Sequence, residues 1–230
     1  MDERQAIEVL QEVKTFLENH DVTFWLDYGT LLGAARNGKF IPWDHDIDIG
    51  IWKNDVDTLA PSLKELETKG YSLHFNYHLQ SHEYTVVALH KNDVCIGLNI
   101  YTEQNNNAVT KWFTHIRLGQ LQTILQDPHN TEKNTLLTSL VSLCAQRLSN
   151  KMRKRLISML QYVSLHMGWY KEIILSVPCD YFINLEKMNF YHMSFNVPSN
   201  YKKYLTIRYG KQWRIPNKDY VHLTDDGAIQ

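Results

Sequence analysis

One strictly alternating segment, Asp46-Ile47-Asp48-Ile49-Gly50-Ile51, constrains the fold of this 230-residue chain more than any other feature. Successive side chains of a β-strand point to opposite faces of a sheet, so the three isoleucines share one face and the two aspartates share the other. The isoleucines predict that one side of the strand packs on a hydrophobic core. The carboxylates of Asp46 and Asp48 then project together from the opposite side.

Two neighbouring carboxylates repel each other and raise each other's pKa unless a cation lies between them. Oxygen ligands of this kind suit Mg²⁺ or Mn²⁺, and such an ion serves phosphoryl transfer. We therefore expect Asp46 and Asp48 to be catalytic carboxylates and metal ligands. The plainer alternative is a surface turn with solvated acids. A calcium loop is excluded, because Ile49 and Asp55 stand where that loop needs glycine and glutamate.

A glycine turn precedes the carboxylate strand, at Gly29 and Thr30. Glycine lets a backbone approach a ligand closely, and the free N–H groups at a helix start suit phosphate. We expect Thr30 to cap the following helix, with Gly29, Thr30 and Arg36 binding the donor phosphates and Lys39 adding a further cation. An ordinary helix cap is the commoner meaning of such a turn, and its place before the acidic strand favours the phosphate interpretation.

The remaining hydrophobic pattern indicates an α/β (α+β) fold, with strands and helices in the first half and a mostly helical second half. Helices are expected at 2–19, 30–38, 61–69 and 200–209, with Pro61 at the first position of the third, and a long helical stretch at 133–176. Strands are expected at 22–27, 46–51, 71–77, 84–90, 94–101 and 108–115. We expect one domain over 1–230, with a helical insertion at about 120–190.

The composition narrows the setting of the protein. A formal net charge of −1 gives the whole chain no attraction to nucleic acid. Three widely spaced cysteines form neither a disulfide framework nor a metal pair, which favours a reducing compartment. The first residues lack the apolar core of a secretion signal, and no stretch approaches the roughly 20 apolar residues that span a bilayer. We expect a cytoplasmic protein.

Two further signals have plain interpretations. His78 and His82 are four residues apart, but a strand or loop setting favours surface histidines over a metal pair. The basic run from Arg147 to Arg155 is expected to be a solvated helix face. Its sharper interpretation is a platform for an anionic acceptor or a membrane-bound glycolipid.

The segment FWLDYGTLLGAARNGKFIPWDHDIDIGI (24–51) resembles the signature of the LicD and fukutin-related protein family. The segment VPSNYKKYLTIRYGKQWRIP (197–216) resembles that family's C-terminal helix, which ends in Tyr-Gly. The resemblance implies a nucleotidyltransferase-like fold, which is a mixed sheet flanked by helices. It further implies transfer of a phospho-group from a CDP-linked donor to a sugar hydroxyl. It also implies that Asp46 and Asp48 bind the metal and that Gly29 and Thr30 form the donor-phosphate turn.

One position departs from the family pattern. The family's third acid lies in a later strand, and the matching segment Leu98-Asn99-Ile100-Tyr101 has Asn99 at that position. An amide has no charge and takes no proton at neutral pH. Asp93 is a nearby acid that could substitute, and Asp44, Asp27 and Asp93 are the candidates for the general base.

These expectations together describe a magnesium-dependent transferase of phosphorus-containing groups. The resemblance implies that the donor is CDP-linked choline, ribitol or glycerol, and that the acceptor is a glycan or glycolipid such as a cell-surface polysaccharide. Peripheral membrane contact would come through the acceptor. Two alternatives stay open: a nucleotidyltransferase that uses a nucleoside triphosphate, and a degenerate binder of nucleotide or glycan without activity, which Asn99 favours.

Overall fold

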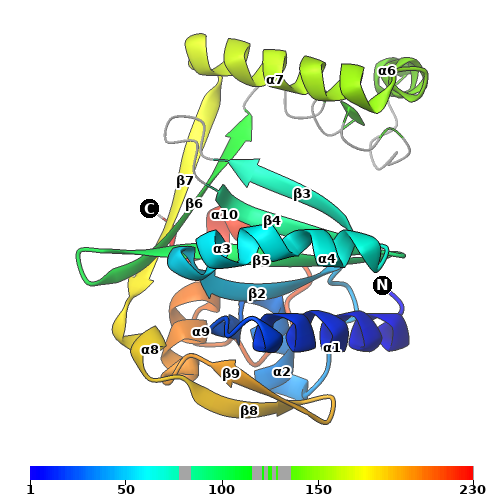
Figure 1. The fold of residues 1–230 in the computed structure, drawn as a ribbon. Helices are drawn as coiled ribbons and strands as arrows, with labels where there is room; N and C mark the ends of the chain where they lie inside the picture. Colours follow the sequence, from blue (N-terminus) through cyan, green and yellow to red (C-terminus); the bar gives the residue numbers. More distant parts are fainter. Residues whose placement is uncertain (78–83, 116–120, 122–123, 126–127, 129–135, 230) are drawn as a thin grey trace. The chain divides into compact units, whose positions relative to one another are not determined.

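The structure is a computed structural model that describes residues 1–77, 84–115, 121, 124–125, 128 and 136–229. Its centre is a seven-stranded mixed sheet in the order β1-β2-β5-β4-β3, and β6 pairs with both β5 and β7 (Figure 1). The strands β8 and β9 form a separate hairpin. The predicted α/β class with a mixed sheet flanked by helices is confirmed. The strands are β1 Phe24–Leu26, β2 Asp46–Trp52, β3 Ser72–Tyr77, β4 Tyr84–Lys91, β5 Val94–Gln104, β6 Asn107–His115, β7 Tyr170–Pro178, β8 Glu186–Phe190 and β9 Met193–Val197.

The helices of the described residues are mostly short. None of them has both the length and the apolar character needed to cross a membrane. They are α1 Glu3–Asn19, α2 Tyr28–Asn37, α3 Lys53–Leu59, the 3₁₀-helix η1 Ala60–Ser62, α4 Leu63–Thr68, α6 Leu136–Gln146, α7 Asn150–His166, α8 Asp180–Ile183, α9 Tyr201–Tyr209 and α10 His222–Asp225.

The chain divides into two compact units. The first comprises residues 1–78, 83–112 and 174–230, and the second comprises 79–82 and 113–173. The first unit contains β1 to β5 and the hairpin, and the second contains α6 and α7. The strands β7 and β8 fall within the range 120–190 assigned to a helical insertion, so its helical part is shorter than expected.

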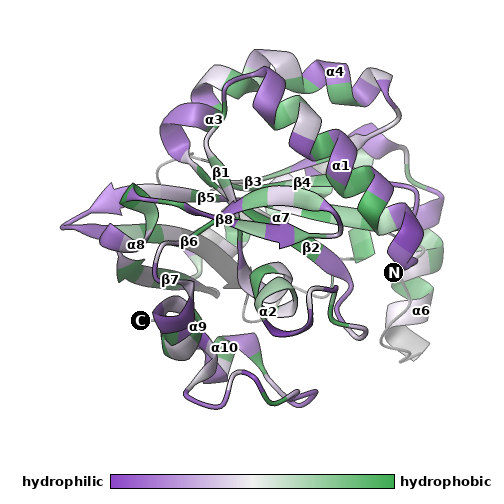
Figure 2. Ribbon diagram, turned by 90° about the horizontal axis from the view of Figure 1, so that it is seen from below, coloured by the Kyte–Doolittle hydropathy of each residue, from purple (hydrophilic) through white to green (hydrophobic). Residues whose placement is uncertain are grey.

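The central strands of the sheet have one apolar and one polar face, as the alternation predicted. Ile47, Ile49 and Ile51 are fully buried. The parallel pairing of β2 with β5 sets them beside Ile96, Leu98 and Ile100. Figure 2 shows α1, α3 and α4 on one side of the sheet, with α2, α9 and α10 on the other. The apolar face therefore belongs to the core, and the opposite face is left for polar side chains.

Several predicted elements need correction. The helix after β2 begins at Lys53, not at Pro61, and Pro61 lies in the 3₁₀ turn that joins α3 to α4. The end of the stretch predicted as helix, 170–176, is strand β7: Ile173, Leu175 and Val177 are buried and alternate with less buried residues. This two-residue period is that of a strand. The β8–β9 hairpin was not predicted.

Candidate active site on the polar face of the sheet

The site is built on the polar face of β2 and β5. Their parallel register pairs Asp46 with Cys95, Asp48 with Gly97 and Gly50 with Asn99. Partners in a register point to the same side of a sheet, so the two aspartates and Asn99 share one face. Asp46 is exposed and Asp48 is half-buried. The predicted projection of both carboxylates from one face is therefore present.

Asn99 contacts the carboxylate strand directly. Its side-chain Nδ2 donates a hydrogen bond of 3.0 Å to Oδ1 of Asp48, and Asn99 is itself buried. Asp93 lies exposed in the turn between β4 and β5, six residues before Asn99 on the same stretch of chain. Cys95, the partner of Asp46 in the register, lies two residues after Asp93, and the residue hydrogen-bonded to Asp48 is the amide Asn99.

Asp44 joins the site from the loop before β2, a position the sequence suggested only as one base candidate among three. It is half-buried and hydrogen-bonded to the side chain of Asp46. A Cβ atom placed on Gly29 would lie 2.1 Å from Oδ2 of Asp44. The backbone of α2 therefore passes directly against this carboxylate, and a larger side chain at position 29 would displace Asp44.

The carboxylates of Asp44, Asp46 and Asp48 lie close enough together to repel one another. Burial, and then the charge of Asp46, raises the pKa of Asp44 to about 7. The same two causes raise the pKa of Asp48 well above its usual value, although the hydrogen bond from Asn99 opposes the shift. Burial and the nearby charges of Asp46 and Asp48 raise the pKa of Cys95 to about 12. Such shifts mark a cluster that a bound cation would stabilise.

The oxygen donors fit a divalent ion only in part. Carboxylate and amide oxygens are hard ligands of the kind that Mg²⁺ and Mn²⁺ take. Among the described residues, no three side chains of aspartate, glutamate, histidine or cysteine are already arranged around one point as a metal site. A metal would therefore rest on Asp46 and Asp48, with water or substrate oxygens completing its shell. The pair His78 and His82 lies outside the described residues.

Thr30 links the start of α2 to the carboxylate strand. Its buried hydroxyl accepts a 2.8 Å hydrogen bond from the backbone N–H of Asp48. The prediction that Thr30 caps this helix is wrong. The helix α2 begins at Tyr28 and its N-cap is Asp27, whose carboxylate accepts a 2.9 Å hydrogen bond from the Tyr28 N–H. Gly29 and Thr30 therefore form the first turn of α2, directly beside the carboxylates.

Asp27 is enclosed and is not available as a base. It is fully buried, accepts hydrogen bonds from the hydroxyls of Tyr101 (2.7 Å) and Tyr204, and lies 3.6 Å from the Arg208 guanidinium. Burial raises the pKa of Asp27, and Arg208 and the two hydroxyls oppose that shift. Because its oxygens are held by these donors, Asp27 has a structural role: it caps α2 and so positions the first turn of that helix.

Arg208 has a buried position that its sequence context does not indicate. It is fully buried, makes two hydrogen bonds to Asp226 and places its guanidinium 3.6 Å from the centre of the Tyr28 ring. An arginine before Tyr-Gly at the end of a helix reads as an exposed cation, and only the tertiary structure shows the acids around it. Lys202 and Lys203 on the same helix are exposed.

Arg36 lies in the last turn of α2, away from its first turn. Its guanidinium carbon is 5.9 Å from the centre of the Trp43 ring, and Nζ of Lys218 approaches the same ring at 5.1 Å. Trp43 immediately precedes Asp44 in the chain. The site therefore has a cationic and aromatic margin next to its acidic centre.

Replacing Gly29 with alanine should lower activity about tenfold or more without unfolding the protein. Alanine favours a helix over glycine by about 1 kcal/mol, and Asp44 can rotate away from the new Cβ. The cost therefore falls on the position of Asp44 and not on the fold. Turnover and thermal unfolding of Gly29→Ala should be compared with those of Gly97→Ala, where a Cβ meets Asp48 at an ordinary 3.6 Å. Equal activity in both variants would contradict the role of this contact.

Comparison with known proteins adds to this geometry. Residues 21–133 match the family described as "LicD/FKTN/FKRP, nucleotidyltransferase domain". "Ribitol 5-phosphate transferase FKRP" of Mus musculus and of Homo sapiens is 51% identical over 53 residues, which is 23% of this chain and 11% of FKRP. The chain thus matches about a tenth of the length of these relatives.

Two other similarities extend over more of the chain. "Lipopolysaccharide cholinephosphotransferase LicD" of Haemophilus influenzae is 21% identical over an alignment that covers 93% of this chain and 91% of that protein. The solution structure of the antibiotic-resistance factor ANT(2'')-Ia covers 73% of this chain and 98% of its own, at 12% identity and a TM-score of 0.35, which is too low to support a function. The resemblance seen in residues 24–51 is confirmed: residues 21–133 match the nucleotidyltransferase domain of the LicD/FKTN/FKRP family.

Proposed function

We propose that this protein is a metal-dependent phosphotransferase. It moves a phosphocholine or phospho-alditol group, such as ribitol phosphate, from a CDP-linked donor to a sugar hydroxyl of a glycan or glycolipid. The observation that supports this most directly is the carboxylate cluster of Asp44, Asp46 and Asp48, tied to the first turn of α2 by Thr30. The names of the relatives FKRP and LicD, both phosphate-group transferases, support the reaction class.

Each site residue has a role in this proposal. Asp46 and Asp48 would hold Mg²⁺ or Mn²⁺, which when bound neutralises charge on the donor diphosphate. Asn99 orients Asp48 through its hydrogen bond. The first turn of α2, at Gly29 and Thr30, presents backbone N–H groups to the donor phosphates. Arg36 supplies a cation at the margin.

We assign the general base to Asp44. Asp27 is enclosed and Asp93 is exposed in the β4–β5 turn, whereas Asp44 is half-buried within the carboxylate cluster. In the proposed step, the acceptor hydroxyl gives its proton to Asp44, and its oxygen bonds to the donor phosphorus that carries the choline or the alditol. The bond between that phosphorus and the bridging oxygen breaks, and cytidine monophosphate leaves.

The product released tests this reaction against its alternatives. The protein should be incubated with CDP-choline, CDP-ribitol or CDP-glycerol, a glycan acceptor and Mg²⁺. Release of cytidine monophosphate would support phosphotransfer. Pyrophosphate release from a nucleoside triphosphate would favour nucleotidyl transfer instead. Calorimetric binding of a CDP-linked donor with no turnover of any donor tested would favour the non-catalytic binder.

Replacing Asn99 with aspartate should strengthen divalent-ion binding by roughly tenfold or more. A third carboxylate beside Asp48 adds a full negative charge where the amide now donates a hydrogen bond. Without metal, the same repulsion should lower the melting temperature. Titration with Mn²⁺ followed by calorimetry measures the affinity, and Asn92→Asp, in the exposed β4–β5 turn, adds the same charge elsewhere. Equal Mn²⁺ affinities in Asn99→Asp and the unchanged protein would place the ion away from Asp48.

A further inference from the structure

The helical pair α6 and α7 carries an unusual charge. Between Leu136 and Trp169 the sequence has no aspartate or glutamate, whereas the chain as a whole has 25 acids against 24 lysines and arginines. Because no acid balances them, these helices form a concentrated positive region in a nearly neutral protein. The five basic residues of this stretch are Arg147, Lys151, Arg153, Lys154 and Arg155.

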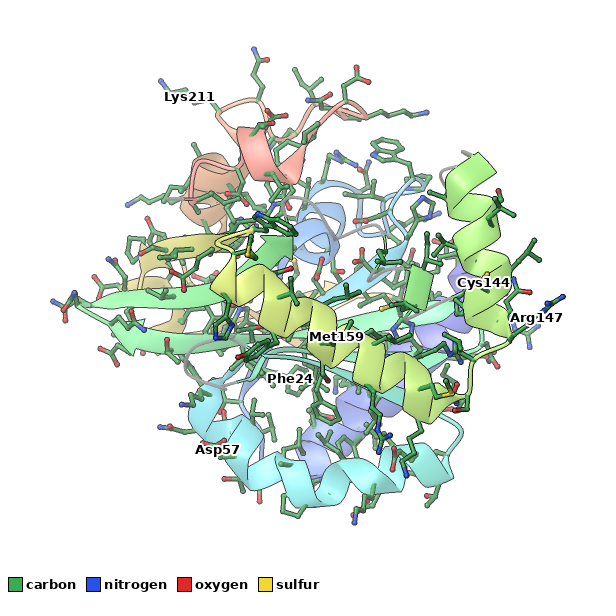
Figure 3. All side chains as sticks on the ribbon, turned by 90° about the horizontal axis from the view of Figure 1, so that it is seen from above. Phe24, Asp57, Cys144, Arg147, Met159 and Lys211 are labelled. Carbon is green, nitrogen blue, oxygen red and sulfur yellow. The ribbon has the colours of Figure 1, made fainter. Side chains whose placement is uncertain are left out.

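Two large apolar residues of α6 are exposed to solvent, unlike those of a helix that packs on a core. Leu140 and Leu143 are 59% and 58% exposed, whereas Ser142 and Ala145 are buried. Residues three apart lie on one side of a helix, so Leu140 and Leu143 form one exposed stripe on α6, and Arg147 follows in the turn after the helix. Figure 3 shows Cys144 and Arg147 on this segment. On this helix the large apolar side chains are exposed and the small ones are buried. Such an exposed apolar surface indicates a binding site for another molecule or for a membrane.

The helix α7 repeats the same combination. Met152, Met159 and Tyr162 are each more than half exposed, and Arg155 lies between them at helical spacing. Figure 3 shows Met159 midway along this helix. Lys151 and Arg155 also line a hollow with Asn150 and Ser158, wide enough to admit a small anionic group. Among the described residues, neither Lys151 nor Arg155 forms an ion pair.

We propose that α6 and α7 bind the surface of an anionic lipid bilayer. Exposed Leu, Met and Tyr side chains enter the interface between headgroups and acyl chains, and the basic residues attract the headgroup phosphates. The absence of acids favours a lipid surface over a second copy of this chain, whose net charge of −1 offers no matching acidic field. The inference concerns location and does not depend on the proposed reaction.

The test is sedimentation of the full chain with lipid vesicles. Phosphatidylcholine vesicles containing phosphatidylglycerol should carry the protein down, and pure phosphatidylcholine vesicles should carry much less. Reversing two charges in Lys151→Glu/Arg155→Glu should lower the bound fraction about tenfold or more, and high salt should do the same. The double variant Leu140→Ser/Leu143→Ser should weaken binding in both salt conditions.

Matched variants in the first unit control for general effects. Lys202→Glu/Lys203→Glu makes the same charge change on exposed α9 residues, and Ile183→Ser/Ile215→Ser removes two residues that are 66% and 62% exposed. Both controls should bind vesicles as the unchanged protein does. The proposal is overturned if anionic vesicles bind no protein, if the controls lose binding equally, or if sedimentation equilibrium shows that the exposed leucines join two copies of the chain. Circular dichroism confirms that each variant is folded.

Discussion

Replacing Asp46 or Asp48 with asparagine should reduce turnover by roughly a thousandfold or more and leave the protein folded. Each change removes one negative oxygen ligand and halves the formal charge offered to a divalent ion, while the size of the side chain is unchanged. Both positions lie on the polar face of β2, and the isoleucines between them keep the strand in the core. The measurement is release of cytidine monophosphate from a CDP-linked donor.

The stability of the same variants gives an independent readout. The raised pKa of Asp48, caused first by burial and then by the charge of Asp46, means that the ionised cluster destabilises the metal-free protein. Asp48→Asn should therefore keep or raise the melting temperature without metal, and it should lose the increase that Mg²⁺ produces in the unchanged protein.

The matched control for these variants is Asp57→Asn, on the exposed side of α3. It makes the same chemical change outside the site and should keep both turnover and the Mg²⁺ response. Full activity in Asp46→Asn and Asp48→Asn would refute the assignment. A melting temperature that falls by many degrees in either variant would show that the carboxylates are structural, in which case lost turnover would carry no information about catalysis.

The sequence predicted the features that depend on short-range periodicity. The alternation at 46–51 placed the isoleucines in the core and the two aspartates on the other face, because a strand has a two-residue period whatever surrounds it. The same reasoning found β3 to β6 and the helices at 3–19 and 201–209. It failed at β7, where Ile173-Ile174-Leu175 sits in a run that also suits a helix.

The features that depend on distant contacts could not be predicted. Thr30 looked like a cap because threonine is common there, but its hydroxyl holds the backbone of Asp48 instead, and Asp27 is the cap. Asp44 reaches the cluster because the loop before β2 turns against Gly29. Arg208 contacts Asp27 across 181 positions of the sequence. Local propensity contains no information about such pairs.

Replacing Arg208 with methionine should lower the free energy of unfolding by about 3–5 kcal/mol. The guanidinium is fully buried and lies among the carboxylates of Asp27 and Asp226 and the hydroxyl of Tyr204. Burial alone would raise the pKa of Asp226, but the hydrogen bond from His222 and the charge and hydrogen bonds of Arg208 keep it below its usual value. Methionine fills similar space and leaves these acids without their cation.

Denaturant unfolding at neutral pH measures this loss, and Arg214→Met, an exposed arginine, should change the stability by less than about 0.5 kcal/mol. A double variant separates lost packing from unpaired charge. If Asp226 is left with an uncompensated charge in Arg208→Met, then adding Asp226→Asn should restore part of the stability, because the amide has no charge to bury. If the second substitution instead lowers the free energy of unfolding by as much as Asp226→Asn does alone, Arg208 and Asp226 do not act as an ion pair. The stabilisation that Arg208 gives to Asp27 and the start of α2 would then come from its packing against Tyr28.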